Sequence, residues 1–156
     1  MSELIEGLWH ELGRPCSERA VEVALAFCDD RERAYDPAHV VLAHGDAHPH
    51  NTLQVPGADP AAFKFIDPEG LLIEPAYDLA IPMREWGDEL LKGDPVALGH
   101  ARCERLARFT GVDPGPIWQW GFIERVGSGL YLKKLGLHEW APPFLKVADA
   151  WAAAEA

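Results

Sequence analysis

Three side chains in the middle of the chain have the types and spacing of a phosphoryl-transfer site. Asp46 and Asn51 lie five positions apart in a polar loop, and Asp67 follows the next apolar run. In kinase-type sites an aspartate orients the attacking hydroxyl, while an asparagine five positions later and an aspartate after the next strand hold the metal ion. The sequence therefore predicts that these three side chains converge on one divalent cation.

The residue types at these positions suit the chemistry of the transfer step. Phosphoryl transfer passes through a loose transition state, so the protein mainly has to place the nucleophile and neutralise negative charge. The carboxylate of Asp46 can accept the proton of a substrate hydroxyl. Magnesium prefers hard oxygen ligands and retains several waters, which suits one carboxylate, Asp67, plus the amide oxygen of Asn51. We therefore expect Mg²⁺ as a cofactor and a small-molecule hydroxyl as the acceptor.

Three short segments around these residues carry a family resemblance. Residues 44–51 read His-Gly-Asp-Ala-His-Pro-His-Asn, residues 66–70 read Ile-Asp-Pro-Glu-Gly, and residues 74–80 read Glu-Pro-Ala-Tyr-Asp-Leu-Ala. They resemble the aminoglycoside phosphotransferase and choline kinase-like superfamily, whose loop reads His-Gly-Asp-x-His-x-x-Asn. The sequence is most similar to the streptomycin 6-phosphotransferase and hydroxyurea phosphotransferase branch. The resemblance is strong over residues 42–86 and weaker over 101–151.

The resemblance implies a fold and a division of chemical roles. The fold would be α+β, the carboxy-terminal lobe of a protein kinase-like structure, mostly helical with a small β-hairpin that carries the catalytic and metal loops. Asp46 would be the catalytic base, and Asn51 and Asp67 would hold Mg²⁺. ATP would supply the γ-phosphoryl group, and the acceptor would be a hydroxyl of an aminoglycoside-like antibiotic or a related small molecule.

The resemblance also implies supporting roles for residues around the loop. His44 would pack the catalytic loop, with His48 beside it, and Asp78 would be a buried organiser of the loops. An aspartate that enters a helix is commonly an amino-terminal cap, and we expect that to be the main role of Asp78. Glu69 is either a supporting group near the metal or a plain loop residue. Glu69 and His50 also stand where the family usually has other residue types.

Members of this superfamily carry an amino-terminal lobe with a nucleotide-covering loop and a phosphate-binding lysine. The first 43 residues contain neither a lysine nor a glycine-rich loop. The sequence therefore predicts a single domain over residues 1–156, the carboxy-terminal lobe without its nucleotide lobe. An apolar face would then be exposed, where a missing lobe or a second copy of the chain could bind. The alternative is a catalytically incompetent, truncated or pseudokinase lobe that acts as a binding module.

The charge balance limits which kinds of molecule the chain is expected to bind. The chain has 14 basic and 25 acidic residues and a formal net charge of −11, which argues against nucleic acid and anionic membranes and favours a cationic acceptor. Glu85, Asp88 and Glu89 form an acidic group that could hold such a substrate, although a solvated helix face is the simpler interpretation. The 48% hydrophobic content and six tryptophans predict a packed core despite the charge.

The cysteines and the hydropathy pattern indicate a cytoplasmic protein. Cys16, Cys28 and Cys103 are odd in number and widely spaced, which argues against a disulfide framework and a structural zinc cluster. We find no basic start followed by an apolar run, and no stretch long enough to span a bilayer. Reduced thiols in the cytoplasm are the expected state.

Hydrophobic periodicity and turn residues predict the elements that must position the site. A buried strand over residues 40–42 would lead into the loop, and a hairpin of residues 52–55 and 62–66 would bring Asn51 and Asp67 together. The helices are expected at residues 2–13 with Ser2 as cap, from residue 18 with Ser17 as cap, at 77–91 with a kink or late start at Pro82, at 96–109 before Gly111, at 117–135 after Asp113, and after Pro143.

Every second residue of the loop, from His44 to His50, has a side chain that could bind a metal ion, which allows one competing metal site. His44, Asp46, His48 and His50 would lie on one face of a strand and could bind zinc, as in a zinc-dependent hydrolase. Pro49 interrupts such a strand, and no further histidines follow with ligand spacing. A polar turn without chemistry is the remaining alternative for this loop.

Overall fold

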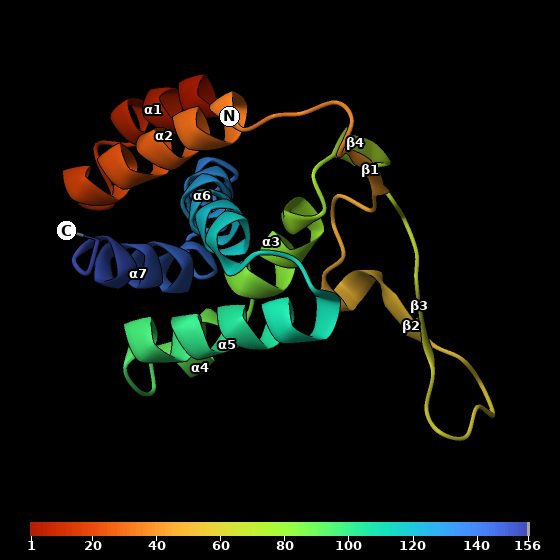
Figure 1. Ribbon diagram of the computed structural model, residues 1–156. Coiled ribbons are helices and arrows are strands. Elements are labelled where there is room, and N and C mark those ends of the chain that lie inside the picture. Colours follow the sequence, from red (N-terminus) through yellow and green to blue (C-terminus); the bar gives the residue numbers. More distant parts are fainter. Residues whose placement is uncertain (156) are drawn as a thin grey trace.

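The structure is a computed structural model that describes residues 1–155, and its elements form an α+β fold (Figure 1). The predicted fold class is therefore confirmed at this level. The elements in order are α1 (Ser2–Glu11), α2 (Glu18–Arg33), β1 (Val41–Ala43), the 3₁₀ turn η1 (Pro49–Asn51), β2 (Thr52–Gln54), β3 (Phe63–Phe65), β4 (Leu71–Ile73), α3 (Ala76–Arg84), α4 (Gly87–Leu90), α5 (Pro95–Thr110), α6 (Pro114–Lys134) and α7 (Ala141–Ala152).

Helix α6 is the centre of the helical body, with the other helices arranged around it (Figure 1). Its apolar side chains point in several directions, and Ile117, Phe122, Ile123, Val126 and Leu130 have no exposed surface. A helix that is apolar on all sides belongs in the middle of a core. α6 packs against α1, α2, α3, α5 and α7, so an element that carries site residues can be fixed by contact with it.

Several helix ends follow the local sequence as predicted. The Ser17 side chain accepts the backbone N–H of Ala20 at the start of α2, and Asp113 caps α6 in the same way. Gly111 ends α5 in the left-handed conformation that glycine tolerates best. Two predicted starts are wrong: Ser2 is the first residue of α1 rather than its cap, and α7 begins at Ala141, because prolines are tolerated in the first helical turn.

The strands form two separate two-stranded antiparallel sheets. β2 pairs with β3, with Thr52 opposite Phe65, which confirms the predicted hairpin. β1 pairs with β4, with Leu42 opposite Leu72, and β4 was not predicted. The prediction that the strand before the loop is buried is wrong, because Leu42 is 74% and Leu72 is 70% exposed.

The helix predicted over residues 77–91 is divided in two. α3 ends at Arg84, Glu85 is extended, and Trp86 takes a left-handed backbone with φ of 53° before α4 begins. The carbonyl groups at this break are satisfied by two arginines. Arg102 donates to Glu85 O at 2.8 Å and Pro82 O at 3.2 Å, and Arg125 donates to Met83 O at 2.6 Å.

Helix α3 lies unusually close to α6 because the contact position on α6 is a glycine. A Cβ atom on Gly121 would lie 2.5 Å from Cβ of Met83, closer than real atoms approach. The absence of a side chain at Gly121 therefore lets the end of α3 reach the surface of α6. This contact brings the residue after Met83 within reach of polar side chains one turn further along α6.

Across residues 1–155, none of the helices has the length and apolar character needed to cross a membrane.

Cys16, Cys28 and Cys103 are buried free thiols.

Candidate active site

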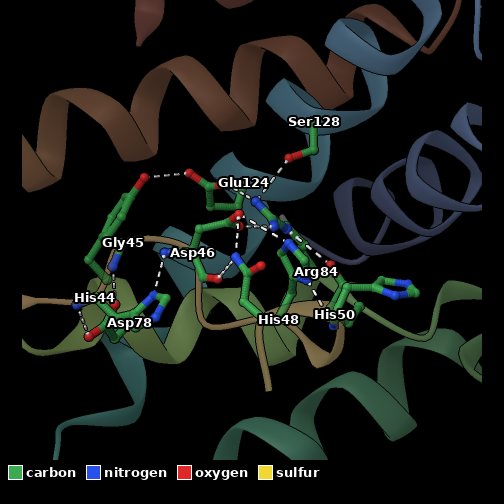
Figure 2. A network of polar contacts seen from close by, with 12 residues as sticks. His44, Gly45, Asp46, His48, His50, Asp78, Arg84, Glu124 and Ser128 are labelled. Atoms are coloured by element: carbon green, nitrogen blue, oxygen red, sulfur yellow. Dashed lines mark hydrogen bonds and ion pairs between the residues drawn. The ribbon is translucent and has the colours of Figure 1, made fainter. Parts of the chain in front are cut away.

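The loop after β1 is held in place by one carboxylate from helix α3 (Figure 2). Asp78 accepts the backbone N–H of Gly45 on Oδ1 and that of His44 on Oδ2, both at 2.8 Å. Asp78 is half-buried and stands at the third position of α3, whose cap is Pro75, so the expected role as an amino-terminal cap is wrong. Its hydrogen-bonding capacity is directed at the loop instead of its own helix.

His44 joins the loop to the chain segment that leads into Asp67. Its Nε2 lies 3.0 Å from the carbonyl oxygen of Ile66, and its Nδ1 accepts the backbone N–H of Asp46 at 3.3 Å. A ring nitrogen that accepts carries no proton, so the proton is on Nε2, which donates to Ile66. The ring also packs edge-on against Phe65, with centroids 5.4 Å apart. Both ring nitrogens are therefore engaged within the protein.

Three donors hold the carboxylate of Asp46 (Figure 2). Arg84 Nη2 donates to Oδ1 at 2.7 Å, and Asn51 Nδ2 lies 3.3 Å from Oδ2 and 3.0 Å from the Asp46 carbonyl oxygen. His48 Nε2 lies 3.1 Å from Oδ2. Because His48 Nδ1 accepts the N–H of His50 at 3.1 Å, its proton is on Nε2, where it donates to Asp46.

Arg84 connects this carboxylate to helix α6. Its Nη1 donates to Glu124 Oε2 at 3.0 Å, and its Nε donates to Glu85 at 3.2 Å. Glu124 is only 5% exposed, and its other oxygen accepts the hydroxyl of Tyr77 at 3.0 Å. Burial alone would lower the pKa of Arg84, but Glu124, Asp46 and Glu85 outweigh it and raise the pKa. Burial, and then the negative charge of Glu124, raise the pKa of Tyr77, so its hydroxyl stays a donor.

The Asp46 carboxylate opens into a cleft of about 490 Å³. The cleft brings together acidic groups and aromatic rings, and several of the rings come from α6, α7 and the segment between them. Its lining includes Asp46, Glu69, Glu85, Glu124, Arg84, His48, His50, Tyr77, Tyr131, Trp140 and Phe144. Four carboxylates against one guanidinium make the cleft strongly negative at neutral pH, which suits a cationic molecule with apolar parts.

A larger cavity of about 600 Å³ lies under the β2–β3 hairpin and is lined mostly by apolar side chains, including Phe63, Phe65 and Trp86. The Asp46 side chain does not line it. The smaller cleft is therefore the one in which a bound molecule could come within hydrogen-bond reach of the Asp46 carboxylate.

Asn51 and Asp67 stand at neighbouring ends of the β2–β3 hairpin. The N–H of Ile66 donates to Asn51 O at 2.9 Å, so Asp67 is one residue beyond the paired position. Since Asn51 Nδ2 is directed at Asp46, its Oδ1 is the atom left to accept another partner. Asp67 is exposed and has a left-handed backbone with φ of 58°. The hairpin thus brings the backbones of the two residues together, and the convergence of their side chains on one ion stays a prediction.

Glu69 stands at the rim of the cleft beside the loop. It is exposed, and its N–H donates to His44 O at 2.8 Å. A Cβ atom on Gly45 would lie 3.0 Å from Cβ of Glu69, and Gly45 has φ of 87°. Glycine at position 45 therefore allows both the turn of the loop and the close approach of residue 69.

The acidic group at residues 85–89 is divided between two places. Glu85 is half-buried, bonds to Arg84 and lines the cleft with Asp46. Asp88 and Glu89 are exposed and line an adjoining cavity of about 400 Å³, which shares Glu85, Trp140 and Phe144 with the Asp46 cleft. Asp88 and Glu89 are therefore not among the side chains that surround Asp46.

The competing zinc arrangement is not assembled in the described part of the chain. Residues 1–155 contain no group of three or more His, Cys, Asp or Glu side chains placed to hold one metal ion. The loop turns through η1 at Pro49 instead of continuing as a strand, so the alternation that would align the four side chains is lost. His48 and His50 have their rings 5.7 Å apart at the rim of the cleft.

Sequence analysis missed Arg84, Glu124 and Tyr77. The spacing of two of these residues could have indicated a shared role, because Tyr77 and Arg84 are seven residues apart and lie on the same face of a helix. Glu124 and Arg125 are the charged pair in the long apolar run of α6, and charged residues are rarely buried unless they have partners. Such a pair inside a core helix indicates a buried polar network.

Comparisons with protein-family models, with curated proteins and with solved structures find no match for this chain.

Proposed function

We propose that this chain is the catalytic and acceptor-binding lobe of a protein kinase-like small-molecule kinase. It would transfer the γ-phosphoryl group of ATP to a hydroxyl of a cationic, aminoglycoside-like acceptor. The observation that carries the proposal is the Asp46 carboxylate, fixed by Arg84, His48 and Asn51 at the base of an acidic and aromatic cleft.

The hydrogen bonds of Asp46 support a role in orienting the acceptor. An ionised carboxylate offers about four lone-pair directions. Arg84 occupies one on Oδ1, while His48 and Asn51 approach Oδ2. One direction remains for the hydroxyl of an acceptor in the cleft. A carboxylate held by three donors is fixed in orientation, which suits a loose transition state in which positioning matters most.

The walls of the cleft support a cationic acceptor. Glu69 is exposed at the rim, and the second oxygen of Glu85 is not engaged by Arg84, so both can bind an ammonium group. Tyr131 and Trp140 are 51% and 65% exposed and offer ring faces to cations and apolar ring atoms. An aminocyclitol carries hydroxyl and cationic groups on one rigid ring and would use both features.

Asn51 and Asp67 are the residues that would hold a magnesium ion bound with ATP. Asn51 Oδ1 and the exposed carboxylate of Asp67 are hard oxygen donors at adjacent backbone positions. Magnesium is commonly held by one or two protein oxygens together with phosphates and waters. When bound, the ion would neutralise charge on the phosphate oxygens. The protein residues bind the ion and keep the acceptor hydroxyl beside Asp46.

A metal-binding experiment tests Asp67 separately from turnover. We expect the chain to bind Mn²⁺, used as a spectroscopic substitute for Mg²⁺, and Asp67→Ala to weaken that binding at least about tenfold. Asp59→Ala is the control, because Asp59 lies in the exposed turn of the same hairpin. Electron paramagnetic resonance of free Mn²⁺ gives the affinity. Equal affinities for the two variants would remove Asp67 from the metal site.

The phosphotransfer experiment tests the proposed function itself. The chain, supplied with an added nucleotide lobe, is incubated with Mg²⁺, labelled ATP and streptomycin, and labelled product is measured. We expect Asp46→Ala to abolish transfer and Asp29→Ala, an exposed change on α2, to leave it intact. Circular dichroism establishes that both variants are folded. Transfer by Asp46→Ala at the wild-type rate would exclude the assigned role of Asp46.

One observation favours a second function, a binding module without catalysis. Leu42 and Leu72 of the β1–β4 sheet, and Phe63 and Phe65 on one face of the β2–β3 hairpin, are large apolar side chains, and each is more than half exposed. Such an apolar surface is typical of a site that another protein or domain covers. Acceptor binding by the chain without any phosphotransfer, together with capture of a second polypeptide on this surface, would favour this alternative.

A further inference from the structure

Arg84 lies between the acidic groups of the cleft and is enclosed by them. Its side chain is 15% exposed, and its three nitrogens are directed at Asp46, Glu124 and Glu85 (Figure 2). Ser128 Oγ adds a long contact at 3.5 Å to the nitrogen that bonds Glu124. A planar guanidinium with five N–H donors can hold several acceptors at fixed angles at once, which a lysine cannot do.

The backbone that carries Arg84 is itself fixed from behind. Arg102 and Arg125 donate to the carbonyl groups of Pro82, Met83 and Glu85, on both sides of position 84. Arg125 is completely buried, and its guanidinium lies 4.9 Å from the centre of the Trp151 ring. The glycine at position 121 keeps Met83 against α6. The position of Arg84 is therefore set by the core and not by the flexible end of a surface side chain.

We propose that Arg84 is a positioning residue, which ties the carboxylate of Asp46 to Glu124 so that the free oxygen direction of Asp46 faces the acceptor hydroxyl. The inference rests on the proposed phosphotransfer function, because it concerns the same carboxylate. It goes further in assigning a residue that does not touch the reacting atoms. Arg84 fixes Oδ1, while His48 and Asn51 fix Oδ2, and the carboxylate cannot rotate without losing one of these contacts.

This role separates the effect of Arg84 on turnover from its effect on acceptor binding. Without Arg84 the carboxylate can rotate, and a displacement of about 1 Å at a reacting group costs roughly 100-fold in rate. The same change removes a positive charge from a cleft that binds cations, so acceptor affinity should not fall. A unit charge several ångströms away in a solvated cleft changes affinity by about threefold. A residue with only a structural role would instead lower the apparent kcat through loss of folded protein, and that loss disappears when rates are expressed per folded molecule.

Three substitutions at this position provide the test. We expect Arg84→Met to lower kcat about 100-fold and to leave the KM for streptomycin unchanged or about threefold lower. Arg84→Gln should behave similarly. Arg84→Lys keeps the charge but cannot bridge Asp46 and Glu124, so it should recover part of the lost kcat. The folded fraction of each variant is measured by thermal unfolding, and rates are expressed per folded molecule.

A contact measurement that uses neither ATP nor acceptor separates the two proposals. The side-chain nitrogen signals of Arg84 are followed by nuclear magnetic resonance in the wild-type chain and in Asp46→Ala, with Asp29→Ala as the control. We expect Asp46→Ala to shift the Arg84 signals and the control to leave them in place. Unchanged signals in Asp46→Ala would overturn the contact and with it the positioning role.

The combined outcomes distinguish a failure of the positioning role from a failure of the proposed function. If the wild-type chain transfers phosphate and Arg84→Met does so within threefold of its rate, the positioning role is overturned and the kinase function stands. A rise in KM with unchanged kcat, or no recovery in Arg84→Lys, also overturns it. If the contact is present but the wild-type chain transfers no phosphate, the proposed function fails, and the positioning role falls with it.

Discussion

The carboxylate of Asp78 lies against the backbone of Gly45, whose N–H donates to Oδ1 at 2.8 Å. The other oxygen, Oδ2, accepts the N–H of His44. One side chain of α3 therefore fixes two successive peptide groups immediately before Asp46. The same helix ends with Arg84, which holds the Asp46 carboxylate, so α3 controls both the backbone and the side chain of the residue to which we assign catalysis.

Replacing Asp78 should loosen the loop and destabilise the fold. Asp78→Ala leaves two half-buried N–H groups without their acceptor, and we expect a loss of about 2 to 4 kcal/mol in the free energy of unfolding. Asp78→Asn keeps one acceptor oxygen and should lose roughly half as much. Urea denaturation measures both, with the exposed Asp88→Ala as the control. Equal stability of Asp78→Ala and the control would contradict the assigned anchoring.

Replacing glycine with alanine should change the free energy of unfolding in opposite directions at two helical positions. A Cβ atom on Gly99 of α5 would lie 2.6 Å from the Trp151 ring, so Gly99→Ala should destabilise the protein by about 1 to 3 kcal/mol. Gly7 of α1 has open space at that position, and Gly7→Ala should stabilise it by about 0.5 to 1 kcal/mol. Urea midpoints of the two variants check the sign, and a stable Gly99→Ala would show that α5 and α7 are less closely packed.

The exposed leucine pair of the β1–β4 sheet should promote self-association. Leu42 and Leu72 face each other across the strands and are both exposed. Replacing them together, Leu42→Lys with Leu72→Glu, should raise the dissociation constant of any self-complex about tenfold, because two apolar side chains no longer leave water. Sedimentation velocity over a concentration series measures this. Leu4→Lys on α1 removes a similar exposed leucine away from the sheet and should have no effect.

The buried thiols should make the protein less stable at alkaline pH. Burial, and then the charge of Asp149, raise the pKa of Cys16 to about 12, and burial raises that of Cys103 to about 11. The unfolded chain, with ordinary thiol pKa values near 9, loses these protons first. Their contribution is therefore fully present below about pH 9 and is lost as the pH rises toward 12.

The measurement is the urea midpoint at intervals from pH 7 to pH 10.5. We expect a decline that begins near pH 9 and is smaller in Cys16→Ala than in the wild-type chain. The same thiols should react slowly with a disulfide reagent at pH 8 until the protein is unfolded, because the thiolate is the reactive form. An identical pH slope in Cys16→Ala would exclude Cys16 as a source of the decline.

The parts of the fold that depend on neighbouring residues could be predicted from the sequence. Ser17, Gly111 and Asp113 act within one helical turn, and each marks a helix end as expected. The hairpin followed from two apolar runs on either side of a turn. The neighbouring placement of Asn51 and Asp67 came from this local geometry.

Features that depend on distant contacts could not be predicted in this way. The three residues of β4 form a strand only because β1, about thirty positions earlier, supplies hydrogen bonds. The break after Arg84 depends on Arg102 and Arg125 from two later helices, and the partner of Asp78 is the loop rather than its own helix. Arg84 acquires its place beside Asp46 through the packing of α3 on α6, and the spacing of Tyr77 and Arg84 within α3 does not identify Asp46 as a partner.

The cleft has two sides of different origin. Asp46, His48, His50 and Glu69 come from one continuous stretch of the chain, whereas Tyr131, Trp140 and Phe144 belong to the carboxy-terminal region. Substitutions in that region can reshape the space offered to an acceptor while the loop geometry stays intact. Related proteins could therefore come to bind different small molecules through substitutions in the last quarter of the chain, while the geometry of the loop that carries Asp46 stays the same.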